Sequence, residues 1–255
     1  MGERDPQAPP PADEVDAGPP QGRTLSRRDL EGGRMREIYL SVVDPGRALD
    51  DEQLSASLNA TLATKPKGAG WWVFAYGSLL WNPIFPVAES RPALLRGLHR
   101  RFCLWSLASR GSPTAPGLVL GLMPGGACRG VAYRLPAPLA IDELHLLWRR
   151  EMVVGSYEPR WVQMDCGTRR LVGLAFVVKR DHPQFAGALS IEQQADVIGT
   201  ACGHLGSSHD YLERTRVALA SHGVVDPYLD RVAAAVQARC AASPGLDPPS
   251  SAASG

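Results

Sequence analysis

Two short stretches of the sequence carry residue types that could do chemistry. The first, Tyr76-Gly77-Ser78-Leu79, follows an aromatic and β-branched run, Trp71–Tyr76, that is typical of a buried strand. A Gly-Ser pair at a strand end lets the chain turn sharply and leaves backbone N–H groups without a sheet partner. Such groups can bind a carboxylate or stabilise a developing oxyanion. An ordinary strand-to-loop turn is the alternative interpretation.

The second stretch contains Glu151, near the end of a predicted helix over 138–153. At 100° per residue, Leu144, Leu147, Trp148 and Glu151 share one face, so the carboxylate lies in the apolar stripe. The polar and charged residues expected on the other sides are Asp142, Glu143, His145, Arg149 and Arg150. Burial raises the pKa of a carboxyl group, and a raised pKa suits a general base near neutral pH. An ion pair with a nearby arginine, or a helix end that has begun to turn before Gly155, is the alternative.

Other functional classes are disfavoured by composition and by missing motifs. The chain has 27 Lys+Arg against 26 Asp+Glu and a net charge of +1, which provides no basic field for nucleic acid. Nucleotide-binding glycine motifs are absent, and the six histidines and five cysteines show no metal-ligand spacing. We therefore expect no metal site and no disulfide framework.

The expected location is the cytoplasm. The polar, proline-rich N-terminus does not resemble a signal peptide, and no run approaches the ~18 apolar residues of a membrane-spanning helix. We accordingly expect no membrane association.

Strand patterns come mostly first and helical patterns mostly last, which predicts an α+β domain. The predicted strands are 71–76, 94–106, 117–123, 128–135, 161–165 and 171–178, the last two forming a hairpin. Pro124-Gly125-Gly126 is expected to be a turn between two of them. Three further helices are predicted: one capped by Ser190 and Gln193 and ending near Gly203, one over 208–221, and one opening at Asp226-Pro227.

The domain divides the chain into three parts. Residues 1–70 are expected to be a largely disordered extension with a possible short helix over 51–63, because prolines and charges dominate its first part. This extension could be an interaction tail or a dispensable linker. Residues 71–240 are the predicted catalytic domain, and 241–255 a disordered tail.

Several blocks, in order, resemble the ChaC-like γ-glutamylcyclotransferases. They are Val73–Pro83, Arg96–Phe102, Pro116–Leu122, Gly125–Tyr133, Trp148–Tyr157, Asp210–Leu212 and Gly223–Asp226. The resemblance covers about 71–235 and implies a small, mostly antiparallel β-barrel with packed helices. It further implies a lyase that needs no cofactor and cleaves glutathione to 5-oxoproline and cysteinylglycine. By position, Glu151 matches the catalytic glutamate of the family.

The same resemblance assigns the substrate-binding residues. Tyr76, Gly77, Ser78 and Leu79 match the loop that holds the γ-glutamyl group, and Tyr157 and Tyr211 match tyrosines of the pocket. One stretch departs from the family pattern: 203–209 lacks an expected asparagine before the Tyr211-Leu212 pair. Three readings stay open: a glutathione-specific enzyme, one acting on γ-glutamyl amino acids or γ-glutamylamines, and a non-catalytic γ-glutamyl-binding or interaction module on the same fold. The sequence does not identify a protein partner.

Overall fold

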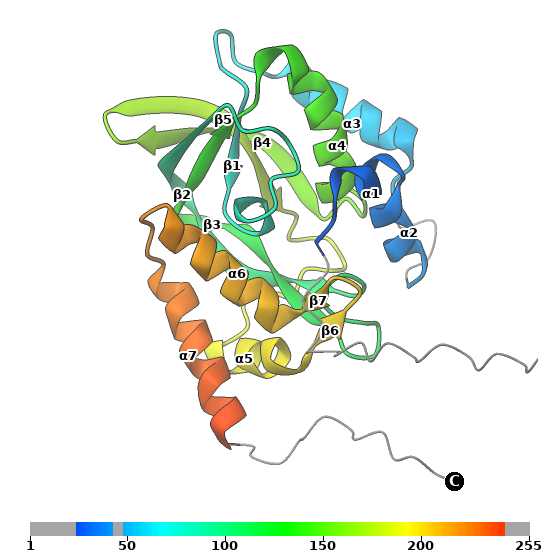
Figure 1. Cartoon of the computed structure of the whole chain (residues 1–255), viewed down its shortest axis with the longest axis vertical. Helices are drawn as coiled ribbons and strands as arrows, with labels where there is room; N and C mark the ends of the chain where they lie inside the picture. The colour runs from blue at the N-terminus through cyan, green and yellow to red at the C-terminus, as the bar shows by residue number, and fades with distance from the viewer. Residues whose placement is uncertain (1–23, 43–47, 243–255) are drawn as a thin grey trace, which may run out of the picture.

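The computed structural model describes residues 24–42 and 48–242, and its centre is a closed five-stranded barrel (Figure 1). The strands follow the order β1-β3-β2-β4-β5 around the barrel. Their bounds are Trp72–Ala75 for β1, Glu89–Ser106 for β2, Gly117–Arg134 for β3, Tyr157–Cys166 for β4 and Arg169–Val178 for β5. All pairings are antiparallel except those of β5 with β1 and β3. The predicted α+β class and mostly antiparallel barrel are confirmed.

The predicted break at Pro124-Gly125-Gly126 is wrong, because β3 runs through it as one strand paired with β2 along its length. The register shifts between Arg96 and Leu98, opposite the two glycines. Gly125 and Gly126 adopt φ values of 96° and 64°, a conformation that glycine accepts most readily. The pattern that resembles a turn is therefore an irregularity of the β-bulge type inside a long, bent strand.

The predicted hairpin is confirmed. Cys166 pairs with Arg169, which leaves Gly167 and Thr168 as a two-residue connection between β4 and β5. Gly167 has a φ of 66°, as tight hairpin turns require.

The helices also follow the predicted signals closely. They are α3 (Asp51–Ala63), α4 (Ala140–Glu151), α5 (Ile191–Thr200), α6 (Ser208–Ser221) and α7 (Pro227–Ala242). Ser190 and Gln193 form the expected reciprocal capping box at the start of α5. The Asp226 carboxylate accepts from the N–H groups of Tyr228 and Leu229 at 3.0 and 3.2 Å, which caps α7. Other short elements are the 3₁₀ turns η2 (Ser78–Leu80) and η3 (Ala137–Leu139), and the two-stranded ribbon of β6 (Cys202–Gly203) and β7 (Gly206–Ser207).

Two groups of helices cover the barrel (Figure 1). Helices α5, α6 and α7 pack together on one side, while α4 contacts α3 and two N-terminal helices on the other. The main core joins the barrel interior to both groups and includes fully buried Phe74, Phe102, Trp148 and Phe176. No helix in the described ranges combines the length and apolar character required to cross a membrane.

The N-terminal extension differs from the prediction between residues 24 and 42. Two helices form there, α1 (Arg27–Glu31) and α2 (Arg34–Leu40), with Leu25, Leu30 and Ile38 buried. These helices carry little local signal, because their apolar residues are few and need the rest of the domain to cover them. The helix predicted over 51–63 is present as α3. The disorder predicted for 1–20 falls outside the described residues, as does most of the tail predicted over 241–255. The first two residues of that tail are instead the end of α7, which runs to Ala242.

Candidate active site

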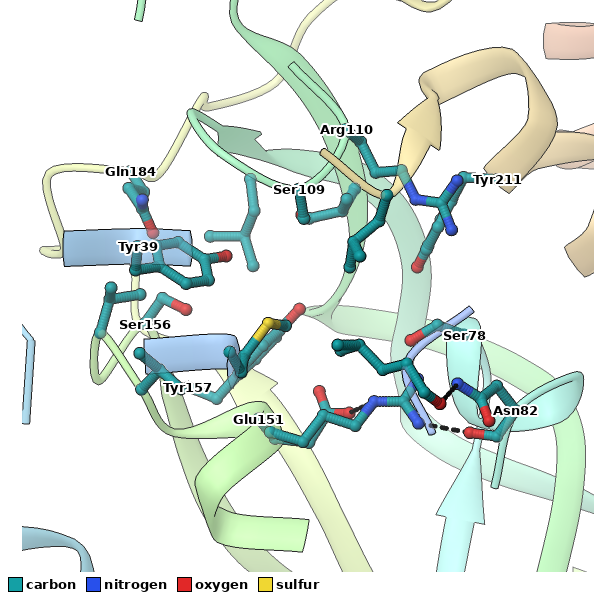
Figure 2. Close-up of a pocket in the computed structure, with 18 of the residues that line it drawn as sticks. Tyr39, Ser78, Asn82, Ser109, Arg110, Glu151, Ser156, Tyr157, Gln184 and Tyr211 are labelled. Atoms are coloured by element: carbon teal, nitrogen blue, oxygen red, sulfur yellow. Dashed lines mark hydrogen bonds and ion pairs between the residues drawn. The ribbon is translucent and has the colours of Figure 1, made fainter. Parts of the chain in front are cut away.

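A pocket lies where α4 ends, beside the loop after β1 and the loop between β2 and β3. It measures about 90 Å³. The sequence-predicted residues that line it are Ser78, Glu151, Tyr157 and Tyr211, and Figure 2 shows all four facing the same space. The structure thus brings together side chains from α4, β4, α6 and the loop after β1. The two that are farthest apart in sequence, Ser78 and Tyr211, are separated by 133 positions.

Glu151 is the last residue of α4, directly after the apolar stripe that was predicted to carry it. Leu144, Leu147 and Trp148 are 2%, 0% and 1% exposed, and the Glu151 side chain retains only 14% of its exposure. Within the described residues, its buried Oε1 accepts no hydrogen bond. The C-terminal end of a helix also carries partial negative charge, which disfavours a carboxylate.

The alternative interpretation of Glu151, an ion pair with a nearby arginine, is correct in part. Arg150 Nε lies 3.1 Å from Oε1, while Arg150 Nη1 donates to the backbone carbonyl of Asn82. Burial raises the pKa of Glu151, and the positive charge of Arg150 opposes that rise without cancelling it. Burial likewise lowers the pKa of Arg150. Arg150 therefore moderates the basicity of Glu151 rather than neutralising it.

Two of the polar residues expected on the other sides of α4, Glu143 and Arg150, are also buried, with exposures of 3% and 7%. Helices α1 and α2 pack against α4. Arg27 of α1 donates two hydrogen bonds to Glu143, at 2.8 and 2.6 Å, and so compensates its buried charge.

The loop after β1 places its four predicted residues in different roles. Ser78 lines the pocket, and it begins η2, whose first N–H groups have no partner within the turn. The Tyr76 hydroxyl donates to the carbonyl of Phe176 at 2.7 Å, so its side chain anchors the loop to the barrel. Leu79 is buried in the core. A Cβ on Gly77 would lie 2.7 Å from Tyr211 Oη, so only glycine leaves room for that hydroxyl.

Tyr157 and Tyr211 bind the backbone of the same residue of β3, Leu120. Tyr157 Oη donates to the Leu120 carbonyl at 3.0 Å, and Tyr211 Oη accepts from the Leu120 N–H at 3.4 Å. Burial raises the pKa of both phenols, that of Tyr211 to about 12, so both stay protonated near neutral pH. Because Tyr211 accepts at Leu120, its own proton remains available to a ligand.

Several polar residues of the pocket were not predicted from the sequence. They are Tyr39, Ser109, Arg110, Ser156 and Gln184. Arg110 is 4% exposed, forms an ion pair with Asp210 at 3.0 Å and lies 5.6 Å from the centroid of the Tyr211 ring. These residues occupy irregular segments or the N-terminal helices, where no periodicity marks an inward-facing side chain. In the described part of the chain, no group of three or more His, Cys, Asp or Glu could hold a metal ion.

The closed barrel with helices packed around it is the fold that the resemblance to γ-glutamylcyclotransferases implies. The chain belongs to the ChaC-like family, since the family model described as "ChaC-like protein" matches residues 71–239.

Named relatives and a solved structure agree with this assignment. A glutathione-specific γ-glutamylcyclotransferase of Escherichia coli (strain K12) is 41% identical over 187 residues, covering 73% of this chain and 81% of the relative. The human glutathione-specific γ-glutamylcyclotransferase 1 is 34% identical over 148 residues, covering 56% and 67%. A yeast γ-glutamyl cyclotransferase specific to glutathione superposes with a TM-score of 0.62 at 24% identity, covering 67% of this chain and 97% of that one, which supports the fold.

The raised pKa of Glu151 predicts a stability effect with a defined sign. The pKa of Glu151 is higher in the folded chain than in the unfolded chain. Between these two pKa values the folded chain binds more protons than the unfolded chain does, so the free energy of unfolding falls as pH rises through that range. E151Q lacks this titration, but it also leaves the buried Arg150 guanidinium without its counter-charge at every pH. The predicted effect is therefore a pH dependence: the melting temperature of E151Q relative to the wild type should rise from pH ~4 to neutral pH.

Calorimetry across pH tests this, with E158Q as the matched control. Glu158 is half exposed, and the Arg160 guanidinium lowers its pKa, so its neutralisation should slightly destabilise the fold at neutral pH. A melting-temperature difference between E151Q and the wild type that does not change with pH would contradict a raised pKa for Glu151.

Proposed function

We propose that this protein is a glutathione-specific γ-glutamylcyclotransferase that releases 5-oxoproline and cysteinylglycine. The observation that carries the proposal is the buried Oε1 of Glu151, which accepts no hydrogen bond within the described residues and faces the same pocket as Ser78 and Tyr211. The names of the E. coli and human relatives support the choice of substrate.

The reaction closes a five-membered lactam within the substrate. The α-amine of the γ-glutamyl group must lose a proton, since its reference pKa of about 7.7–8.0 keeps much of it as ammonium near neutral pH. Ionised Glu151 takes that proton, and the amine nitrogen then bonds to the γ-carbonyl carbon. The ring nitrogen must also lose its second proton, and the tetrahedral intermediate collapses by breaking the bond to the cysteine nitrogen. The leaving nitrogen takes both protons, with the carboxyl group of Glu151 as the carrier, so the products are a neutral lactam and a cysteinyl ammonium and Glu151 is ionised again.

The other pocket groups bind and orient the substrate in this proposal. N–H groups at the start of η2 and the free hydroxyl proton of Tyr211 are donors for the oxyanion and the γ-glutamyl group. Arg110 supplies positive charge for a substrate carboxylate, and Asp210 holds its guanidinium in place. Tyr76, Gly77 and Leu79 act indirectly: they fix the loop and leave space for Tyr211.

We place the reaction in the cytoplasm, where glutathione sets the thiol redox balance. The cysteines with described side chains, Cys103, Cys128, Cys166 and Cys202, are free thiols, which suits such a compartment. The absence of a cofactor requirement remains a prediction from the sequence.

Substrate choice and the role of Glu151 are tested together by assaying 5-oxoproline from glutathione, γ-Glu-Ala and γ-Glu-ε-Lys. We expect turnover of glutathione well above the other two, and a fall of about 10²- to 10⁴-fold in kcat for E151Q. E158Q is the matched control, since Glu158 lies on the exposed side of β4. Undiminished turnover by E151Q would refute the mechanism, and turnover of γ-Glu-Ala alone would refute the substrate.

The pH dependence of kcat/KM tests the pairing of Arg150 with Glu151. Activity needs ionised Glu151, so it should fall toward acid pH with a midpoint above the ordinary glutamate pKa of ~4.3. Arg150 favours the ionised form; R150M should therefore shift the acid limb to higher pH, whereas R150K should leave it close to the wild type. A shift of equal size in R150K, or none in R150M, would show that the charge of Arg150 does not set this pKa.

A further inference from the structure

The N-terminal segment 24–42 lies outside residues 71–239, yet it forms one wall of the pocket. Thr24, Leu25, Met35 and Tyr39 all line the cavity. Tyr39 comes from α2, and its ring faces the pocket beside Gln184 and Ser156 in Figure 2. The part of the chain that the family model does not match therefore contributes directly to the candidate active site.

This segment is fixed in place by charge and by apolar packing. Besides the Arg27–Glu143 pair, Leu25, Leu30 and Ile38 form a cluster with Ala108, Leu146 and Leu205. Glu143 is 4% exposed at its side chain, so removal of Arg27 would leave a buried charge unpaired. A dispensable linker has no reason to compensate a buried charge of the domain.

A chain of polar contacts links the segment to Glu151. The carbonyl of Leu25 accepts a hydrogen bond from Asn82 Nδ2 at 3.0 Å. The backbone carbonyl of Asn82 in turn accepts from Arg150, whose Nε lies 3.1 Å from Glu151 Oε1 (Figure 2). The loop that contains Asn82 thus contacts segment 24–42 directly and Glu151, the proposed base, through Arg150.

Tyr39 offers a hydrogen-bond donor on the side of the pocket away from Ser78. Figure 2 places Ser78 and Tyr39 on opposite sides, with Glu151 between them. Burial and the negative charge of Glu151 raise the pKa of the phenol, opposed by the nearby Ser109 hydroxyl, so it stays protonated near neutral pH. Around it, Ser156 and Gln184 are buried polar residues, 4% and 8% exposed.

The two sides of the pocket correspond to the two halves of the substrate. If the γ-glutamyl group lies against Ser78 with its carbonyl beside Glu151, the leaving half extends toward Tyr39. That half carries peptide and carboxylate oxygens, which accept hydrogen bonds. The cavity of about 90 Å³ is small beside the ~300–1,000 Å³ of most ligand pockets, so its Ser78 and Tyr39 sides lie close to each other.

We propose that Tyr39 is a substrate-binding residue whose hydroxyl donates to the cysteinylglycine half of glutathione, making segment 24–42 part of the active site. This inference rests on the proposed function. It assigns the N-terminal segment to specificity for the leaving group, not to the ring-closing chemistry.

The test is Y39F, which keeps the ring and removes only the hydroxyl. Loss of one hydrogen bond should raise KM for glutathione roughly three- to tenfold while kcat changes less than about twofold. The matched control is Y228F: the Tyr228 hydroxyl also makes buried hydrogen bonds, to the N–H of Phe102 and to Gln194, but does not line the pocket. Y228F should leave KM unchanged.

Product inhibition identifies the half of the site that changes. In Y39F the inhibition constant of cysteinylglycine should rise by a similar factor, while that of 5-oxoproline stays at the wild-type value. An unchanged KM, or equal weakening of both products, would overturn the assignment of Tyr39 and leave the proposed function intact. A wild-type enzyme that does not turn over glutathione would instead overturn the proposed function, and this inference with it.

Discussion

The desolvation of one carboxylate is the constraint on which the site depends. Glu151 closes α4 directly after its most buried turn, and burial raises its pKa although a guanidinium lies 3.1 Å away. An isolated buried carboxylate is unfavourable and is retained only where the surrounding structure is stable enough to hold it. The fused cores of the barrel and the helices supply that stability, with Trp148 packed edge-on against Phe176 of β5.

The barrel positions the pocket by binding its tyrosines to backbone groups. Tyr76 is fixed to β5 through Phe176, and Tyr157 and Tyr211 are fixed to opposite ends of the Leu120 residue in β3. Main-chain groups of a closed sheet move little, so the three rings hold their places relative to Glu151. The same arrangement explains Gly77: any side chain there would occupy the place of the Tyr211 hydroxyl.

Local signals made much of this fold predictable. The capping box at Ser190, the cap at Asp226 and the stripe that ends at Glu151 act within a few residues, and all appear in the structure. The signal at Pro124-Gly125-Gly126 was ambiguous, because a bulge and a turn both need glycine at positive φ. Tyr39 and Arg110 could not be found from the sequence: their place in the pocket depends on tertiary packing of α2 and of an irregular loop.

The proposed chemistry depends on the protonation state of one side chain, which can be measured directly. Carbon-13 NMR of the side-chain carboxyl groups, with the Glu151 signal identified by its absence in E151Q, gives the pKa of Glu151 in the folded protein. A pKa above the ordinary glutamate value of ~4.3 is expected, because burial outweighs the charge of Arg150. A pKa at or below that value would mean that Arg150 neutralises the site, and would contradict Glu151 as a base tuned by desolvation.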